Sequence, residues 1–190
     1  MTDLDLILTR QSALALRAPG PDDATLQAML GAAVCAPDHG RLAPWRFIVI
    51  EGEGRHALGR VLREALRRRV ADTTEAVLAK EEAKALRAPA IVVVAAETRA
   101  RKSIPVVEQV IAAGIAAYNI LLAAHAFGLG GMWRTGPHAY DPQVRRALGL
   151  GAETTIVAFL YLGTPDAMPR PRERGGRGAC VTRWPGPDAA

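Results

Sequence analysis

One apolar segment, VIAAGIAAYNILLAAHA at residues 110–126, limits the possible folds more than any other feature of the chain. It is nearly as long as the ~20 residues that a membrane span needs. It contains Asn119 and His125, however, and it follows Glu108 and Gln109, and such polar groups are costly in lipid. We therefore interpret it as the helix of a soluble protein. A helix that is apolar on nearly all faces has to be covered on all faces, either at the centre of the domain or at a subunit interface.

Composition indicates one compact domain outside the secretory pathway. The chain has 190 residues, of which 49% are hydrophobic and 5% aromatic, which favours closely packed helices over an aromatic-rich barrel. Cys35 and Cys180 stand alone, so we expect neither a disulfide scaffold nor a metal site. The first ten residues, MTDLDLILTR, carry two early acids and do not resemble a signal peptide. We expect a reducing cytoplasm.

Helix and strand signals alternate along the chain. This alternation predicts a single α+β or α/β layered domain over residues 1–190, with the Pro-, Gly- and Arg-rich residues 166–190 as an irregular C-terminal arm. The periodicities predict helices at residues 4–10, from Asp22 to near Pro37, and at 55–70, 72–86, 106–127 and 142–149, and extended segments at 47–50, 90–95, 132–134 and 154–162.

Three segments carry side chains that suit ligand binding. Arg10-Gln11-Ser12 closes the first helix, where a guanidinium and a hydroxyl together can hold a phosphate, although an arginine there also compensates the helix dipole. The loop at residues 36–45 presents His39, which suits a general acid, a ligand contact or a plain surface position. Residues 128–136, GLGGMWRTG, place glycines between helix and strand. That order is the reverse of a Rossmann fingerprint.

The formal charge of +5 suits an anionic partner, and it keeps a nucleic-acid-binding protein among the alternatives. The arginines of residues 55–69 are more typical of a solvated helix face, however, and few aromatic residues are available to stack on bases. The sequence contains no paired-carboxylate, Ser/His/Asp or metal-ligand arrangement above chance.

Five motifs in a fixed order resemble the nitroreductase family, in particular its short, YdjA-like members. They are R-x-S at Arg10 and Ser12, A-P-D-H-x₄-P-W at residues 36–45, F-x-V-I-E-G-E-G at 47–54, G-x-G-G-x-W-R-[ST]-G at 128–136, and I-V-x-F-L-Y-L-G-T-P at 156–165. The chain departs from the family pattern at Gln11 and Cys35, where relatives often carry basic residues, and at Arg41, which replaces an asparagine.

The resemblance implies an α+β sandwich, with a mixed β-sheet flanked by helices, that forms an intertwined homodimer on the long central helix. It also implies two FMN molecules at the interface, each touched by both chains. Carried over by position, the FMN-binding residues are Arg10, Gln11, Ser12, Cys35, His39, Trp133, Arg134 and Thr135. The segment expected to meet NAD(P)H is Ala123, Ala124, His125, Ala126, Phe127 and Gly128.

The function implied is an NAD(P)H-dependent FMN oxidoreductase that passes hydride through flavin N5 to an electron-poor small molecule, nitroaromatic or quinone-like, by a ping-pong mechanism. FMN carries the chemistry, so no side-chain nucleophile is required. Arg10, or another cation near N1 and C2=O of the flavin, is expected to stabilise the reduced cofactor. The alternatives are a different flavin-dependent dehydrogenation, a flavin-binding protein with little turnover, and the nucleic-acid-binding protein above.

Overall fold

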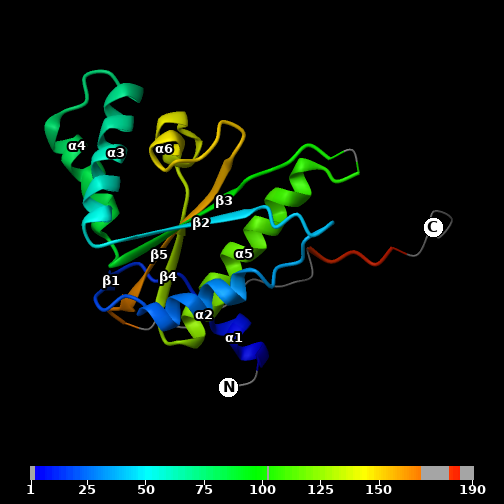
Figure 1. Ribbon diagram of the computed structural model, residues 1–190. Coiled ribbons are helices and arrows are strands. Elements are labelled where there is room, and N and C mark those ends of the chain that lie inside the picture. The colour runs from blue at the N-terminus through cyan, green and yellow to red at the C-terminus, as the bar shows by residue number, and fades with distance from the viewer. Residues whose placement is uncertain (1–2, 102, 168–179, 185–190) are drawn as a thin grey trace.

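The computed structural model describes residues 3–101, 103–167 and 180–184 and has an α+β architecture (Figure 1). The predicted α+β class is confirmed. The order of elements is α1 (Asp3–Thr9), β1 (Leu16–Arg17), α2 (Asp23–Ala33), β2 (Trp45–Glu51), α3 (Glu53–Arg69), α4 (Glu75–Glu82), the 3₁₀ helix η1 (Ala83–Leu86), β3 (Ala90–Ala96), α5 (Val106–Ala126), β4 (Gly130–Arg134), the 3₁₀ helix η2 (Pro137–Tyr140), α6 (Pro142–Ala147) and β5 (Thr155–Pro165).

Polar caps fix where several helices begin. The Asp22 carboxylate accepts a hydrogen bond from the Thr25 backbone N–H at 2.8 Å and starts α2. Asp141 accepts from two backbone N–H groups and starts α6, whose first residue is proline. The predicted helix 72–86 was wrong at its start, because Asp72 has a φ of 58° and helix α4 begins only after its cap Thr74. The same segment ends as the separate 3₁₀ helix η1.

The sheet is built around β3 and β5. Strand β3 is buried along its whole length, and it pairs with β2 on one side and β5 on the other. Strand β5 is long enough to pair also with β4 and β1. All four ladders between named strands are antiparallel in the described chain, and parallel pairing enters at the isolated bridge between Ser12 and Gly131. That bridge attaches the N-terminal segment to the start of β4.

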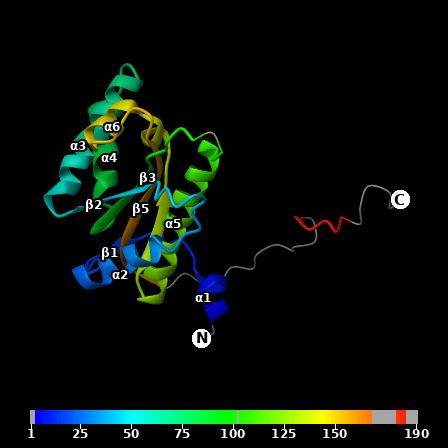
Figure 2. The same ribbon diagram turned by 45° about the vertical axis from the view of Figure 1, so that its right-hand side comes forward.

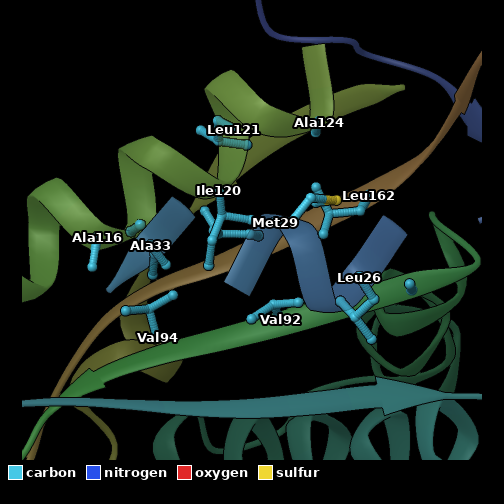
Figure 3. Packing of buried hydrophobic residues seen from close by; sticks show 14 of the residues in the cluster. Leu26, Met29, Ala33, Val92, Val94, Ala116, Ile120, Leu121, Ala124 and Leu162 are labelled. Carbon is cyan, nitrogen blue, oxygen red and sulfur yellow. The ribbon is translucent and has the colours of Figure 1, made fainter. Parts of the chain in front are cut away.

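Helices cover both faces of this sheet (Figures 1 and 2). On one face, α2 and α5 pack against the sheet, and Figure 3 shows Met29 and Ile120 meeting above Val92. On the other face, α3 and α6 close a second core over Ile91 and Val93. The pleat of β3 explains the division, because successive side chains of a strand point to opposite faces.

Helix α5 is covered on one side only within a single chain. Ala113, Ala116 and Ile120 are fully buried, whereas Ile111 is 54% exposed and Phe127 is 53% exposed. Among the described helices, α5 alone has the length and apolar composition of a membrane span, and 39% of its most apolar window is buried. The other side of α5 is therefore apolar surface.

The predicted C-terminal arm falls partly outside the described residues. Residues 166–167 follow β5, and Asp166 forms an ion pair with Arg17 at 3.3 Å. Residues 180–184 contain no α-helix or strand and lie apart from the rest of the chain in Figure 2. The assignment of residues 1–190 to one domain with this arm stays a prediction.

Candidate functional site

A cavity of about 370 Å³ lies beside the end of β4, between the sheet and the α3/η1 layer. Its walls combine aromatic and basic side chains from five parts of the chain. They are Leu62 of α3, Lys84 and Arg87 at η1, Trp133, Arg134, Thr135 and Gly136 at the end of β4, Pro137 and His138 of η2, and Phe159 and Tyr161 of β5. Three of these residues, Trp133, Arg134 and Thr135, are among the predicted flavin contacts.

Successive residues of β4 place their side chains on opposite faces of the sheet. Trp133 packs against the core under α5, and Arg134 projects to the opposite side of the sheet. The Arg134 guanidinium lies 5.8 Å from the centre of the Tyr161 ring. At Gly136 the backbone has a φ of 69°, in the left-handed region that glycine tolerates, and the chain turns out of the strand into η2. The turn brings His138 back to the cavity wall.

The cavity is electropositive. Lys84, Arg87 and Arg134 line it, and within the described chain no carboxylate lies within 4.0 Å of the guanidinium nitrogens of Arg87 or Arg134. Lys84 is paired, because its Nζ lies 2.6 and 2.8 Å from the two carboxylate oxygens of Glu81. A planar ligand with a polar, electron-rich edge therefore finds both stacking surface and positive charge.

Two shifted pKa values describe this environment. Burial raises the pKa of Glu81, but hydrogen bonds from His138 and Lys84 outweigh it and hold that pKa below its ordinary value. Burial raises the pKa of Tyr161, an effect that the charges of Arg134 and Arg87 oppose. Glu81 is therefore ionised, and Tyr161 protonated, at neutral pH.

Replacing Glu81 with glutamine is expected to remove a pH-dependent part of the stability. A carboxyl whose pKa is lowered by folding stabilises the protein above its unfolded-state pKa, and this contribution is lost as pH falls through the folded-state value. Glu81→Gln should therefore lower the free energy of unfolding by about 1–2 kcal/mol near pH 7 and by much less below about pH 3. Urea denaturation at several pH values measures this, and an equal loss at both pH values would contradict it.

The first predicted motif lies at the start of β4. Ser12 bridges to Gly131, and the Ala13 N–H donates to the Gly131 carbonyl at 3.1 Å. The Arg10 guanidinium lies 5.7 Å from the centre of the Tyr118 ring of α5. The predicted residues Arg10–Ser12 and Trp133–Thr135 thus lie at the two ends of one short strand.

His125, predicted to meet the nicotinamide nucleotide, lies beside this first motif. Its Nε2 is 2.9 Å from the Thr9 hydroxyl. Burial first, and then the nearby charge of Arg10, lower the pKa of His125, so its imidazole is neutral at pH 7. Of the rest of this segment, Ala124 is buried in the core, whereas Ala126, Phe127 and Gly128 are exposed.

Cys35 and His39 lie elsewhere. His39 Nδ1 is 2.6 Å from the Glu108 carboxylate in the first turn of α5, and the Cys35 thiol donates to the Gly31 carbonyl at 3.4 Å. The α5 residues beside His39 and Arg10 are Glu108 and Tyr118, which lie ten positions and about 15 Å apart along the helix axis. One chain therefore does not bring His39 and Arg10 to a common point.

The loop that carries His39 has a strained backbone. Arg41 and Ala43 have φ values of 53° and 45°, in a region that non-glycine residues rarely adopt. The Asp38 carboxylate holds the loop closed by accepting from the Ala43 N–H at 2.7 Å. Such strain is maintained only where the surroundings fix the backbone.

Sequence reasoning missed Lys84, Arg87, His138 and Tyr161 as members of the cavity. Tyr161 lies in the motif at residues 156–165, which assigned it no role, and Lys84, Arg87 and His138 belong to no motif. The pairing of β4 with β5 and the packing of η1 bring these three parts of the chain together. A pair of basic residues just before a buried strand was the one available signal, at Lys84 and Arg87.

Comparisons with known proteins bear on the family of this chain. The family model described as Nitroreductase family matches residues 7–164. The chain is 40% identical over 166 residues to "Putative NAD(P)H nitroreductase YdjA" of Escherichia coli K12, covering 87% of this chain and 90% of that protein.

Solved structures share the fold. The nitroreductase-like family protein from Bacillus cereus superposes with a TM-score of 0.84 at 26% identity, over 98% of this chain and 97% of that chain. A nitroreductase of Desulfovibrio desulfuricans, solved in complex with FMN, superposes with a TM-score of 0.73 at 24% identity, over 97% of both chains. The sequence motifs, the fold and these matches together show that the chain belongs to the nitroreductase family.

Proposed function

We propose that this chain is an NAD(P)H-dependent FMN oxidoreductase and that the cavity beside β4 holds the isoalloxazine ring. The observation that carries the proposal is the cavity itself, which is lined both by three predicted flavin contacts at the end of β4 and by the basic residues Lys84 and Arg87. The relative from E. coli is named for NAD(P)H, and the D. desulfuricans structure contains FMN. Membership of the nitroreductase family supports the same chemistry.

The residues present fit a flavin. A volume of about 370 Å³ lies in the range of small-molecule sites, and Phe159 and Tyr161 supply apolar and aromatic wall. The side chains of Arg87 and Arg134 are charged without a carboxylate partner among the described residues. Such cations are well placed for a ring edge that carries carbonyl oxygens.

Each group of residues then has a distinct role. When bound, FMN supplies hydride transfer, taking hydride at N5 from NAD(P)H and giving it to a second small molecule in a ping-pong cycle. Lys84, Arg87 and Arg134 orient the polar edge of the ring and stabilise negative charge there. Arg10 and Ser12 bind the phosphate end. The acceptor is an electron-poor molecule such as a nitroarene or quinone, and the enzyme works in the cytoplasm.

Replacing Arg134 with methionine is expected to weaken FMN binding by about ten- to hundredfold, because a charge-assisted hydrogen bond in a partly closed site contributes on the order of 1.5–3 kcal/mol. Methionine keeps much of the side-chain length, so the wall of the cavity changes little. Titration of the apoprotein with FMN, followed by flavin fluorescence, measures the dissociation constant. Arg146→Met on the exposed side of α6 is the matched control and should bind like the wild type. Equal affinities of both variants would count against the proposed ring site.

The active form is a homodimer on α5. Val106, Val107, Ile111 and Phe127 leave apolar surface along this helix, and a second copy of the chain would cover it. The separation of His39 from Arg10 supports the same arrangement, since a site that uses both needs residues from two chains. Cys35 and His39 then contact the flavin of the other subunit.

Ile111→Arg is expected to convert the dimer to a monomer and to reduce FMN retention, because it places a charge on the exposed apolar surface of α5. Analytical ultracentrifugation gives the mass, and the absorbance of the purified protein gives the bound flavin. Val77→Arg, at an exposed position of α4, is the control and should stay dimeric. A dimeric, flavin-loaded Ile111→Arg protein would contradict the assignment.

A further inference from the structure

His138 ends a chain of hydrogen bonds that runs behind the cavity. Its side chain is 9% exposed, and its Nε2 lies 2.6 Å from Oε1 of Glu81. The same carboxylate accepts hydrogen bonds from Lys84, which is one of the residues that line the cavity. His138 belongs to η2, Glu81 to α4 and Lys84 to η1, so the chain links the β4 side of the cavity to the helical side.

The direction of these hydrogen bonds follows from what each group can do. An ionised carboxylate only accepts, so Nε2 of His138 carries the proton that is donated to Glu81. His138 Nδ1 is buried and has no hydrogen-bond partner. A buried N–H there would be left unsatisfied, which costs more than an unused acceptor lone pair, and the Nε2–H tautomer is therefore favoured.

The side chain of Lys84 would adopt many conformations if Glu81 did not restrain it. Lysine has four rotatable bonds in its side chain, and that of Lys84 is 39% exposed. Glu81 restrains it through both carboxylate oxygens. The Glu81 carboxylate is in turn restrained by the imidazole of His138, which is packed into the wall. The other charged or titratable groups facing the cavity are Arg87, Arg134 and Tyr161.

We propose that His138 and Glu81 are positioning residues that hold the Lys84 ammonium against the polar edge of the bound flavin ring. This inference rests on the proposed function. It adds that the affinity for FMN depends on His138, although the donor nitrogen of His138 bonds to Glu81 and not to the cofactor. Without the hydrogen bond from His138, the Glu81 carboxylate is no longer held in place, and the Lys84 ammonium moves together with it.

The test is a double-mutant cycle on FMN affinity, with the dissociation constant taken from fluorescence titration of the apoprotein. His138→Leu should weaken binding about tenfold, and His138→Gln, which keeps a donor near the Nε2 position, should bind within about threefold of the wild type. In a Lys84→Met background, His138→Leu should change the dissociation constant by less than about twofold, because the lysine through which it acts is already gone. The visible absorption maximum of the bound flavin should shift in His138→Leu and not in His138→Gln.

Leu78→Ala separates positioning from stability. Leu78 is a buried residue of α4 that does not line the cavity, so its truncation lowers the melting temperature without touching the hydrogen-bond chain. The inference is overturned if Leu78→Ala weakens FMN binding as much as His138→Leu does, or if the tenfold loss persists in the Lys84→Met background. If the wild type and Arg146→Met both fail to bind FMN, the proposed function falls, and this inference falls with it.

Discussion

Ile120→Ala is expected to lower the free energy of unfolding by about 3–4 kcal/mol, because removing a fully buried aliphatic side chain costs its transfer free energy and leaves a cavity. Ile120 is 0% exposed and lies between α2 and the sheet, beside Met29 and Ala33 (Figure 3). Its neighbours belong to three elements, α5, α2 and β3, so the gap has no flexible wall that can close it. Chemical denaturation of wild type and variant gives the difference.

The control for Ile120 is a large aliphatic residue at the surface. Leu86 of η1 is 41% exposed, and Leu86→Ala should cost less than about 1 kcal/mol. A loss below 1 kcal/mol for Ile120→Ala, equal to that of Leu86→Ala, would show that α5 does not pack as the centre of this core.

Gly163→Ala is expected to destabilise the protein by about 2–3 kcal/mol, because an added methyl group there has no space. A Cβ at this position of β5 would lie 2.6 Å from Pro89 Cδ and 3.0 Å from the Arg17 carbonyl oxygen. Neither neighbour yields easily, since one belongs to a proline ring and the other to the backbone of β1. Gly163 also pairs with Gly130, so the strain is transmitted to the start of β4.

Gly31→Ala is the matched control, and its expected effect has the opposite sign. Gly31 lies in α2, and a Cβ there would meet no atom within 4 Å. Alanine restricts the unfolded chain and favours the helix, so this variant should gain about 0.5–1 kcal/mol. If both glycine variants change stability in the same direction, the lack of space for a side chain does not explain the glycine at position 163.

The order of elements follows from local signals that act within a few residues. Asp22 and Asp141 are caps that act within three residues, and the β-branched run from Ile91 to Val94 favours a buried strand. Helix α5 packs along one side against the core of this chain, and polar residues within it take part in that packing. Asn119, for instance, donates to the Ala32 carbonyl of α2 at 3.1 Å.

The structural features that the sequence does not predict depend on packing between residues far apart in the chain. The left-handed backbone at Asp72, which delays the start of the predicted helix to Glu75, follows from no residue preference strong enough to detect. Lys84 and His138 meet through Glu81 only because β4 and β5 pair and η1 packs beside them. Motif order predicted the β4 side of the cavity, at Trp133–Thr135, and could not predict the opposite side.

The positions of Cys35 and His39 relative to Arg10 also depend on packing between residues far apart in the chain. The resemblance groups these residues around one flavin, and the fold of one chain places His39 beside the first turn of α5 and Arg10 beside Tyr118, further along the same helix. A linear sequence does not record which side of a ligand is supplied by a second copy of the chain. Their roles as flavin contacts therefore stay predictions that depend on the dimer.

The most direct test of the proposed function is the absorbance spectrum of the purified protein, supplied with FMN, before and after anaerobic addition of NADPH or NADH. We predict flavin bands that persist through gel filtration and bleach when the reduced nicotinamide nucleotide is added, which would establish the reductive half of the cycle. A colourless protein that also fails to retain added FMN would contradict the account of the cavity and of the function built on it.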